Sequence, residues 1–579
     1  MLKNIFITIL LICSVSGVWG QKSVKVKVSG NVITTDGVPA EFINIQLKNT
    51  FYGGTSDGKG YFEFMAPAGQ YTMIVQSIAA HRREFPVTIE EGKENHFADI
   101  EIRENINQLE QVVVTGQFSP QSMRNSLYRV RTVNSEQIRQ KAPTSVQSLL
   151  NTEIGIRLSN DMALGETDFE LMGMSGNNVK ILLDGIPLID RGATKQSLSQ
   201  LDVNSIERVE IVEGPMSVVY GTDALAGVIN IITKKGDGYS EENTWRVGAR
   251  VQEESMGKEY DFFKDKGLHN ESIDLGFNHK SGLFVNGGYT RNNHGGWQGD
   301  LTGREKRWHP KDQALMNGMF GFQNRNMNVW YRLDFLDEKI FGPNNGSELQ
   351  PEKVSDKDFL TKRYTHQLQS DWKLDNRLDV HAALSYQDYK RRTRTTESDL
   401  STGEKWLSSA EASQDITQYK AWIARATVAW NIAPEFSVQP GVEYQWTQGE
   451  GGRIDGTPKV SDLAFFLSAE YKPWEWLSLR PGVRTFIVAD YDAPIAIPSV
   501  LTKFKLTKHM DLRLSYAYGF RSPTLQELYF SFHNDNHDID GNPDLKAEYS
   551  HNITGSVAYR VPVWSLFYTK SCIDFITRN

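Results

Sequence analysis

Residues 416–432 read ITQYKAWIARATVAWNI, and their side chains form two sets that alternate along the chain. Successive side chains of a β-strand point to opposite faces, so a strand here has an apolar, aromatic face and a mixed face. The first face carries Trp422, Ala424, Ala426, Val428 and Trp430, and the second carries Ala421, Ile423, Arg425, Thr427, Ala429 and Asn431. The two tryptophans lie roughly 26 Å apart along such a strand. A tilt of roughly 40° leaves about 20 Å of height, close to the apolar band between the aromatic girdles of a transmembrane barrel.

The same alternation recurs elsewhere after residue 240, in Leu512, Leu514, Tyr516 and Tyr518 and in Leu463, Phe465, Leu467, Ala469 and Tyr471. Aromatic residues make up 11% of the 579 residues and there are 47 glycines, although only 39% of the chain is hydrophobic, which is typical of a β-rich protein. A soluble β-sandwich also alternates, but strands this long with aromatic residues at both ends favour a barrel. The formal net charge of −8 does not indicate a nucleic-acid partner.

The first twenty residues have the pattern of a secretory signal peptide. Lys3 precedes a nearly apolar run over 5–15, and Val18-Trp19-Gly20 ends in a small residue, which predicts cleavage after Gly20. A membrane anchor is the alternative, but the run is shorter than the roughly 18 apolar residues that a spanning helix needs. After cleavage only Cys572 remains, so an intramolecular disulfide is excluded.

The rest of the chain divides by pattern into four regions. Residues 21–105 alternate with frequent turn signals, as in a small β-sandwich, and 106–118 form a linker around three consecutive valines. Residues 119–236 combine a helical segment over 135–150, broken near Pro143, with apolar strands such as 179–183 and 227–233, which predicts a mixed α/β domain. Residues 237–579 carry the long alternating strands of a partial antiparallel barrel.

Three segments of the α/β region carry a family resemblance: LLDGIPL at 182–188, IERVEIVEGP at 206–215 and YGTDALAGVINIIT at 220–233. They resemble the plug domain of the TonB-dependent outer-membrane receptor family. The matching signature residues are Asp184, Gly185, Pro187, Glu207, Arg208, Glu213, Gly214, Tyr220 and Gly221. One departure is Leu171-Met172-Gly173, where the family often has Arg before Gly. Residues 55–62 and 69–71 resemble the non-catalytic carboxypeptidase-regulatory-like domain, an N-terminal arrangement typical of Bacteroidetes-type receptors.

The resemblance implies an outer-membrane transporter rather than an enzyme. Its expected substrate is a scarce chelate too large for porins, which leaves iron–siderophore, haem and cobalamin open. Val112, Val113, Val114 and Thr115, just before the plug, look like the TonB box, an extended β-branched segment suited to strand addition to TonB. The implied partners are TonB with ExbB and ExbD, outer-membrane lipid and the chelate, and the resemblance also allows a surface lipoprotein. It implies no cofactor and no resident metal.

Two histidines lie between barrel segments that also resemble the family, 518–523 and 541–545. His533 and His537 are candidate ligands for haem iron, and two solvated loop histidines are the alternative. The nearby stretch 536–541 hints at a calcium loop, but it starts with Asn536, and Glu548 falls one place late for the final acidic ligand.

The number of barrel strands is expected to be about 14 or 15, whereas the family barrel has 22. The chain ends at Asn579 rather than at a terminal aromatic residue. We therefore expect an incomplete barrel that, expressed alone, fails to give a heat-resistant species because strand edges unpaired in lipid are costly. There are two alternatives to a transporter. One is a surface or secreted ligand-binding protein without transport, and the other is an inactive truncated receptor.

Overall fold

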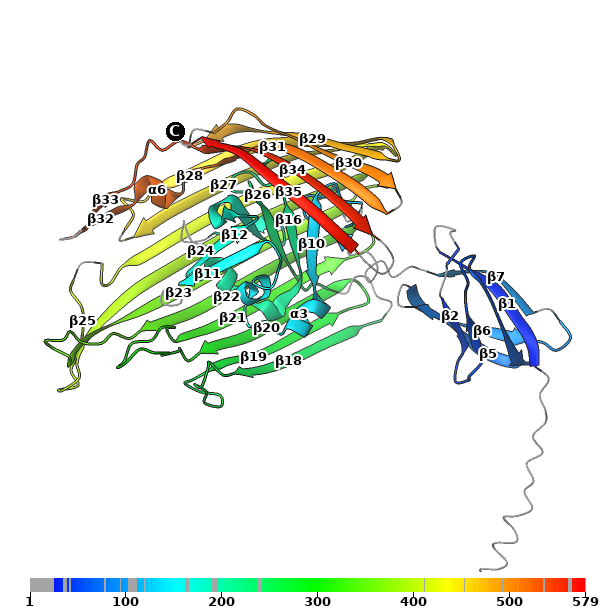
Figure 1. Ribbon diagram of the computed structural model, residues 1–579, viewed down its shortest axis with the longest axis horizontal. Helices are drawn as coiled ribbons and strands as arrows, with labels where there is room; N and C mark the ends of the chain where they lie inside the picture. The colour runs from blue at the N-terminus through cyan, green and yellow to red at the C-terminus, as the bar shows by residue number, and fades with distance from the viewer. Residues whose placement is uncertain are drawn as a thin grey trace, which may run out of the picture. The chain divides into compact units, whose positions relative to one another are not determined.

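The chain is described by a computed structural model (Figure 1). The described residues are 25–577 apart from 35–38, 41–42, 78–79, 94, 103–111, 119–120, 124, 162–165, 190–195, 237–241, 411, 452, 492, 508, 535–536 and 561–564. The signal peptide predicted over 1–20 lies outside them. Residues 1–112 and 113–579 form two compact units, and each is described by itself. Among the described residues, no helix has the length and apolar character needed to cross a bilayer.

The N-terminal unit is a β-sandwich, as predicted. One sheet has the order β4 (Tyr61–Pro67), β1 (Lys25–Thr34), β7 (Asn95–Ile102), and the other has the order β3 (Gly53–Thr55), β2 (Asn44–Leu47), β5 (Gly69–Ser77), β6 (Ala80–Ile89). The alternating apolar residues of both sheets meet in one core, which includes Val28, Val32, Ile45, Leu47 and Met73. The polar residues between them stay on the outer faces.

The plug combines a mixed sheet with short helices. The sheet has the order β10 (Arg129–Asn134), β16 (Ile206–Glu213), β17 (Gly227–Thr233), β14 (Val179–Leu183), β15 (Ile186–Pro187). Every residue of β14 and β17 is buried, which explains why these two parallel strands are almost continuously apolar. The helical segment expected over 135–150 is confirmed as α3 (Ser135–Lys141) and α4 (Val146–Leu150), which end and begin on either side of Pro143.

Smaller elements complete the plug. They are the sheet β11 (Ile156–Asp161), β12 (Glu166–Leu171), β13 (Met174–Ser175), the pair β8 (Val112–Val113) and β9 (Gln121–Ser122), the helix α5 (Ser217–Tyr220), and the 3₁₀ turns η1 (Gly176–Asn178), η2 (Gln196–Gln200) and η3 (Val203–Ser205).

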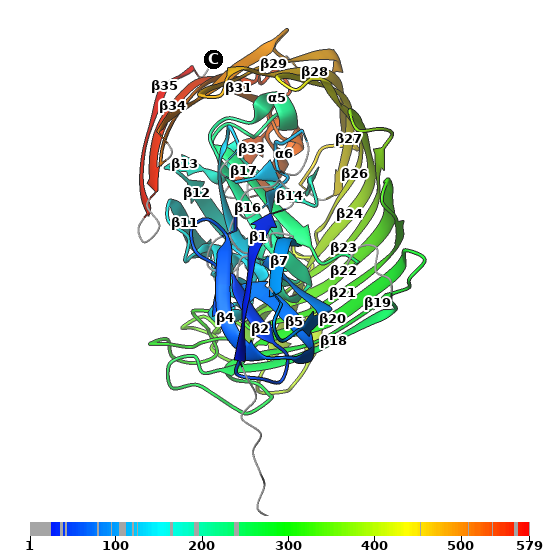
Figure 2. The same ribbon diagram turned by 90° about the vertical axis from the view of Figure 1, so that its right-hand side faces the viewer.

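The largest sheet has sixteen strands and curves around the plug (Figure 2). Its strands are β18 (Thr244–Glu254), β19 (Leu268–Asn278), β20 (Leu283–His294), β21 (Lys311–Gln323), β22 (Met327–Gly342), β23 (Lys353–Lys373), β24 (Leu378–Asp399), β25 (Lys405–Leu407), β26 (Ile416–Ala433), β27 (Phe436–Gly451), β28 (Lys459–Trp474), β29 (Leu477–Ala489), β30 (Ile497–Thr507), β31 (Met510–Arg521), β34 (Glu548–Arg560) and β35 (Ser565–Thr577). Within the described residues β18 pairs only with β19 and β35 only with β34, so the sheet is open between them.

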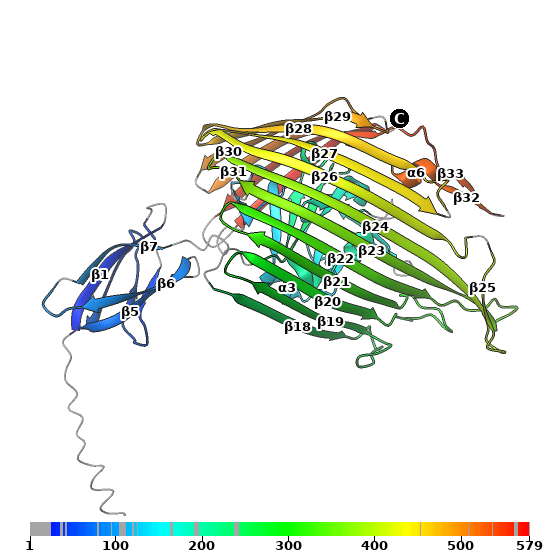
Figure 3. The same cartoon turned by 180° about the vertical axis from the view of Figure 1, so that it is seen from behind.

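The connections differ sharply between the two ends of this sheet (Figure 3). One end has short turns, such as 324–326, 374–377 and 434–435, and the other has long connections, such as 295–310 and 522–547. We call them the short-turn end and the long-loop end. Short turns at one end and longer loops at the other are characteristic of outer-membrane barrels.

The faces predicted for β26 are confirmed. Its inward residues Ala421, Ile423, Arg425, Thr427 and Ala429 are buried, whereas Trp422 and Trp430 are exposed on the outer face. The outer face between the two tryptophans contains only small or apolar side chains, as the hydrocarbon of a bilayer requires.

The outer face of β26 gives a direct test of membrane placement. Ala426→Arg, midway between the two tryptophans, is expected to destabilise the folded protein by about 2–4 kcal/mol because it puts a charge into hydrocarbon. Urea unfolding in lipid vesicles measures the change. Glu435→Arg, at an exposed residue of the short turn after β26, is the control, with an expected cost of about 1 kcal/mol or less. Equal effects of the two substitutions would contradict the lipid-facing assignment.

Candidate functional site

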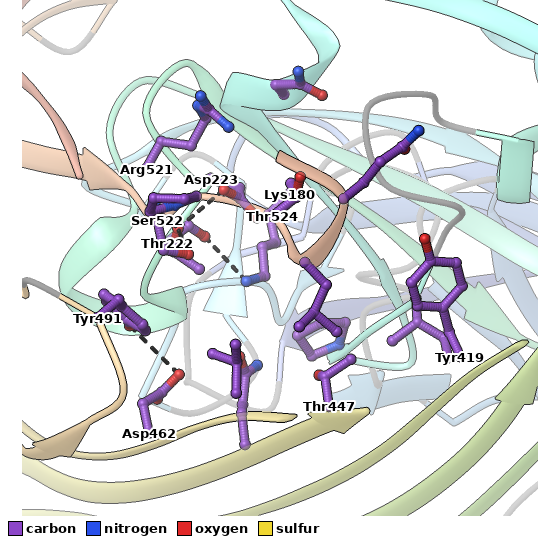
Figure 4. A pocket seen from close by; sticks show the side chains of 18 of the residues that line it. Lys180, Thr222, Asp223, Tyr419, Thr447, Asp462, Tyr491, Arg521, Ser522 and Thr524 are labelled. Carbon is purple, nitrogen blue, oxygen red and sulfur yellow. Dashed lines mark hydrogen bonds between the residues drawn. The ribbon is translucent and has the colours of Figure 1, made fainter. Parts of the chain in front are cut away.

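A cavity of about 200 Å³ lies between the plug and the barrel toward the long-loop end (Figure 4). The plug contributes Asn177, Lys180, Ile181, Pro187, Leu188, Ile189, Thr222 and Asp223, and the barrel contributes Tyr419, Ile423, Gln445, Thr447, Val460, Asp462, Tyr491 and residues 521–526. Polar side chains thus converge from both parts of the unit on one concave site, which is the usual form of a small-molecule site.

Lys180 is the buried cation of this cavity. It is the second residue of β14, and its Nζ donates to the Thr222 carbonyl oxygen at 3.0 Å. Burial lowers the pKa of Lys180, while the carboxylates of Asp223 and Asp462 act in the opposite direction. Figure 4 shows Lys180, Asp223 and Asp462 directed toward the same space. A ligand in this space would meet both a cation and carboxylates.

The barrel loop after β31 closes one side of the cavity and is bonded to the plug. The Ser522 amide donates to Thr222 Oγ1 at 2.8 Å. The loop is held in shape by Arg521, which donates to both carboxylate oxygens of Glu527 at 2.9 and 3.1 Å and to Glu548 at 3.1 Å. Glu527 also completes a capping box at the start of α6 (Leu525–Tyr529). A change in the plug at Thr222 would therefore act on this loop directly.

The Asp184-Gly185-Ile186-Pro187 signature forms the tight turn between β14 and β15. Asp184 and Gly185 both have positive φ, and the Asp184 carboxylate accepts from the Thr233 amide at 3.1 Å and its hydroxyl at 2.7 Å. Gly185 donates to the Asn230 side chain at 2.9 Å. These bonds join the turn to β17, and Pro187 lines the cavity. The signature is thus explained mainly by turn geometry.

The second signature divides into exposed and buried residues. Glu207 is exposed, and Arg208 donates to Glu210 at 2.9 Å. Glu213, almost fully buried, pairs with Arg129 at 3.0 Å and Arg131 at 2.7 Å. Gly214 follows with positive φ. Tyr220 is the last residue of α5, and Gly221 is its C-cap. All residues of α5 are buried.

The segment predicted to be the TonB box lies docked in the plug. Val113 and Thr115 are 0% and 1% exposed. Glu210, itself fully buried, accepts from the Val114 amide at 3.1 Å, the Thr115 amide at 2.8 Å and the Thr115 hydroxyl at 2.6 Å. Asn230 donates to the same hydroxyl at 2.9 Å. For strand addition to a partner, this segment must first leave Glu210. We call residues 113–117 the docked segment.

His533 does not line the cavity that contains Lys180. The hairpin β32 (Ser531–Asn534) and β33 (His537–Asp540) carries both candidate histidines, and the side chain of His537 lies outside the described residues. His533 lines a separate cavity of about 250 Å³ with Asp415 and Asp455. His533, Asp538 and Asp540, all exposed, place ligand atoms within 4.8 Å of one another.

The two aspartates hold the pKa of His533 above its ordinary value of 6.5, mainly through the Asp538 hydrogen bond. A raised pKa means that this contact stabilises the hairpin below about pH 6.5 and is lost as pH rises through the shifted value. We expect proteinase K to cut the hairpin about twofold more slowly in the wild type than in His533→Gln at pH 6. The two rates should converge at pH 9. A ratio that does not change with pH would contradict the charged hairpin contact.

Several residues of the cavity were not singled out from the sequence as candidate site residues. Lys180 and Asp462 lie within strands β14 and β28, where nothing in the local sequence separates a cavity residue from any other buried residue. Tyr491 lies in the connection after β29 and belongs to none of the quoted segments. Thr222 and Asp223 lie inside the quoted segment 220–233, and Arg521 lies inside 518–523, so the resemblance marked their segments without assigning them to the cavity.

Family models match three regions of the chain. Residues 28–114 match the CarboxypepD_reg-like domain, 122–228 the TonB-dependent receptor plug domain, and 219–570 the TonB-dependent receptor-like β-barrel. The barrel model alone covers more than half of the chain.

Curated relatives and solved structures agree with these models. The chain is 25% identical over 482 residues to the iron-regulated outer membrane virulence protein of Vibrio cholerae, which covers 78% of this chain and 66% of that protein. It is 32% identical over 139 residues to the vitamin B12 transporter BtuB of Vibrio vulnificus, which covers 24% of this chain and 23% of that protein. The chain therefore spans less than two thirds of the length of either relative.

The siderophore receptor PirA of Pseudomonas aeruginosa has a similar fold, with a TM-score of 0.59 at 16% identity over 76% of this chain and 73% of that one. Together with the plug and the curved sheet around it, the matching models show that this chain belongs to the TonB-dependent receptor family.

Proposed function

We propose that this chain acts in TonB-dependent uptake of a large chelate across the outer membrane. The observation that carries the proposal is the arrangement of two sites on one plug. The cavity lies toward the long-loop end, and the docked segment lies near Arg480, the fourth residue of β29, a strand that starts at the short-turn end. In this proposal the long-loop end faces the outside and the short-turn end faces the periplasm.

In the proposed mechanism a chelate binds at the cavity and TonB pairs with the released segment around Val113. Strand addition suits this segment because main-chain hydrogen bonds supply the affinity. TonB, with ExbB and ExbD, supplies the pulling force, and the plug rearranges. Several relatives are named as receptors for chelates, including the ferrienterobactin receptor of Escherichia coli and the vitamin B12 transporter of Vibrio vulnificus, which supports a chelate as the cargo.

The test separates binding from uptake. Cells that carry a completed receptor containing this chain in their outer membrane are assayed for saturable binding and for uptake of ferric enterobactin, haem and cyanocobalamin. Val113→Pro is expected to abolish uptake and leave surface binding intact, because proline removes an N–H and resists strand pairing. Val113→Ala, which keeps the N–H, is the control. Uptake by Val113→Pro at the wild-type rate would place the TonB-binding segment elsewhere.

Haem is the second candidate cargo because His533 lies near the long-loop end beside a separate cavity. If haem is the cargo, replacing His533 and His537 together by Ala is expected to weaken haem binding at least tenfold. Unchanged binding in a haem titration would favour a siderophore or cobalamin. Saturable binding without uptake of any of the three, in a protein that extracts without detergent, would instead support a surface or secreted binding protein.

A further inference from the structure

Gly116, in the docked segment, is held at both ends of its own backbone. Its amide donates to the Tyr220 hydroxyl at 3.2 Å, and its carbonyl oxygen accepts from Arg480 Nη1 at 2.5 Å. Gly116 has a φ of +69°, a left-handed conformation that favours glycine, and a Cβ there would lie 2.5 Å from Met216 Cε, so the methionine side chain would have to move. Tyr220 belongs to the plug but Arg480 belongs to the barrel. The barrel therefore contributes directly to docking.

A second barrel residue reaches Gly116 indirectly, through Tyr220. The Arg425 guanidinium carbon lies 5.0 Å from the centroid of the Tyr220 ring, within the range of a cation–π contact. Arg425 is buried on β26, and its Nη1 donates to Glu443 on β27 at 2.7 Å. The cation–π contact holds the Tyr220 ring, and the ring positions the hydroxyl that accepts the hydrogen bond from the Gly116 amide.

The Glu443 carboxylate that binds Arg425 also connects to the cavity, through Arg484. Arg484 donates to the other oxygen of Glu443 at 2.8 Å, and both side chains are 1% exposed. Arg484 packs on Gly221, where a Cβ would lie 3.1 Å from its Nη2, and the next plug residue, Thr222, lines the cavity together with Asp462. Arg484 Nε and Nη1 have no hydrogen-bond partner among the described residues, so its pairing is incomplete. A charge placed in the cavity would alter the hydrogen bond of Arg484 to Glu443, the carboxylate that also binds Arg425.

We infer that Arg425 and Tyr220 are positioning residues through which the barrel sets the docking of the segment, and that Glu443 and Arg484 link this docking to the cavity. The contribution to transport rests on the proposed function. The docking itself does not, because it is a property of the unliganded protein. A purely structural role for the ion cluster would stabilise the barrel without affecting the docked segment selectively.

The experiment measures how often the docked segment opens. A single thiol is introduced as Val114→Cys in a Cys13→Ser, Cys572→Ser background, and its rate of reaction with a maleimide is followed in the folded protein without ligand. Tyr220→Phe and Arg425→Gln are each expected to accelerate labelling about fivefold, as the loss of roughly one hydrogen bond predicts. Because both act through one contact, the double variant should exceed the faster single variant by less than twofold. Arg425→Lys, which keeps the charge over the ring, should recover part of the effect.

Two further variants decide the inference. A second reporter, Val146→Cys in the plug core, should label at an unchanged rate in all of these variants, and equal acceleration there would overturn the inference by showing general loosening. Asp462→Asn should change the Val114→Cys rate at least twofold, but not in the Arg425→Gln background. A wild-type labelling rate of the reporter thiol in Arg425→Gln would overturn the inference that Arg425 acts on the docked segment through Tyr220. No step needs TonB or a chelate, so failure here is distinct from failure of the proposed function.

Discussion

Glu210→Ala is expected to release the docked segment. The substitution removes one fully buried carboxylate that accepts from two amides and one hydroxyl of Val114 and Thr115. Hydrogen bonds to a charged group each contribute about 1.5–3 kcal/mol, and the abandoned donors keep their desolvation cost. Breaking a buried charged contact of this kind typically costs about 3–5 kcal/mol. Docking of the segment should therefore become unfavourable or nearly so.

The rate at which a maleimide labels Val114→Cys measures this release, and an increase of more than about 100-fold is expected from a loss of this size. Glu210→Gln is the matched control because it keeps the shape and one acceptor oxygen, so its effect should be clearly smaller. Asn230→Ala removes one further bond to the docked segment, at the Thr115 hydroxyl, together with the acceptor of the Gly185 amide, and should accelerate labelling about fivefold. A wild-type labelling rate in Glu210→Ala would mean that barrel contacts alone hold the segment.

For the transporter proposed here, release without substrate has a functional consequence. A segment that is permanently free would offer TonB a binding site whether or not the cavity is occupied. In Glu210→Ala, purified TonB should bind the unliganded receptor with an affinity close to that of the liganded wild type. Docking of the segment at Glu210 would then delay TonB binding until a substrate is present.

Glu443→Ala is expected to destabilise the folded unit by about 3–5 kcal/mol. Glu443 pairs with Arg425 at 2.7 Å and Arg484 at 2.8 Å, and all three side chains are buried. Removing the carboxylate takes away the acceptor that both guanidinium groups share among the described residues, so the desolvation cost of each is no longer offset by an ion pair. Urea unfolding in lipid vesicles, followed by tryptophan fluorescence, measures the loss.

The matched control replaces the cluster as a whole. Arg425→Met, Glu443→Leu and Arg484→Met together remove the charges and keep similar volumes, so most of the stability lost in Glu443→Ala should return. Glu435→Ala, an exposed carboxylate outside the cluster, should change stability by less than about 0.5 kcal/mol. If the triple variant is as unstable as Glu443→Ala, the cause is lost packing against Tyr220 and Phe466 rather than unpaired charge.

Which residues face outward on β26 could be predicted because the strand period is a local property of the backbone. Trp422 and Trp430 fall on one face of any extended chain with this sequence. Asp184 and Gly185 were marked by the family resemblance, and the structure explains them as a turn whose positive φ values restrict the residues allowed there. The sequence also marked the segment from Val112 to Thr115 as extended, because β-branched residues in a row, here three valines, favour that conformation.

The partners of these residues were decided only by the tertiary structure. Thr115 meets Glu210 across 95 positions, and Arg480 meets Gly116 across 364, so no local pattern relates them. The family resemblance predicted strand addition of the valine segment to TonB and did not anticipate its docking in the plug. Likewise, Arg425 opposes Glu443 because of the strand register between β26 and β27, and Arg484 joins them from β29. Alternation along each strand determines that a side chain points inward, whereas register and plug placement determine which inward charge it meets.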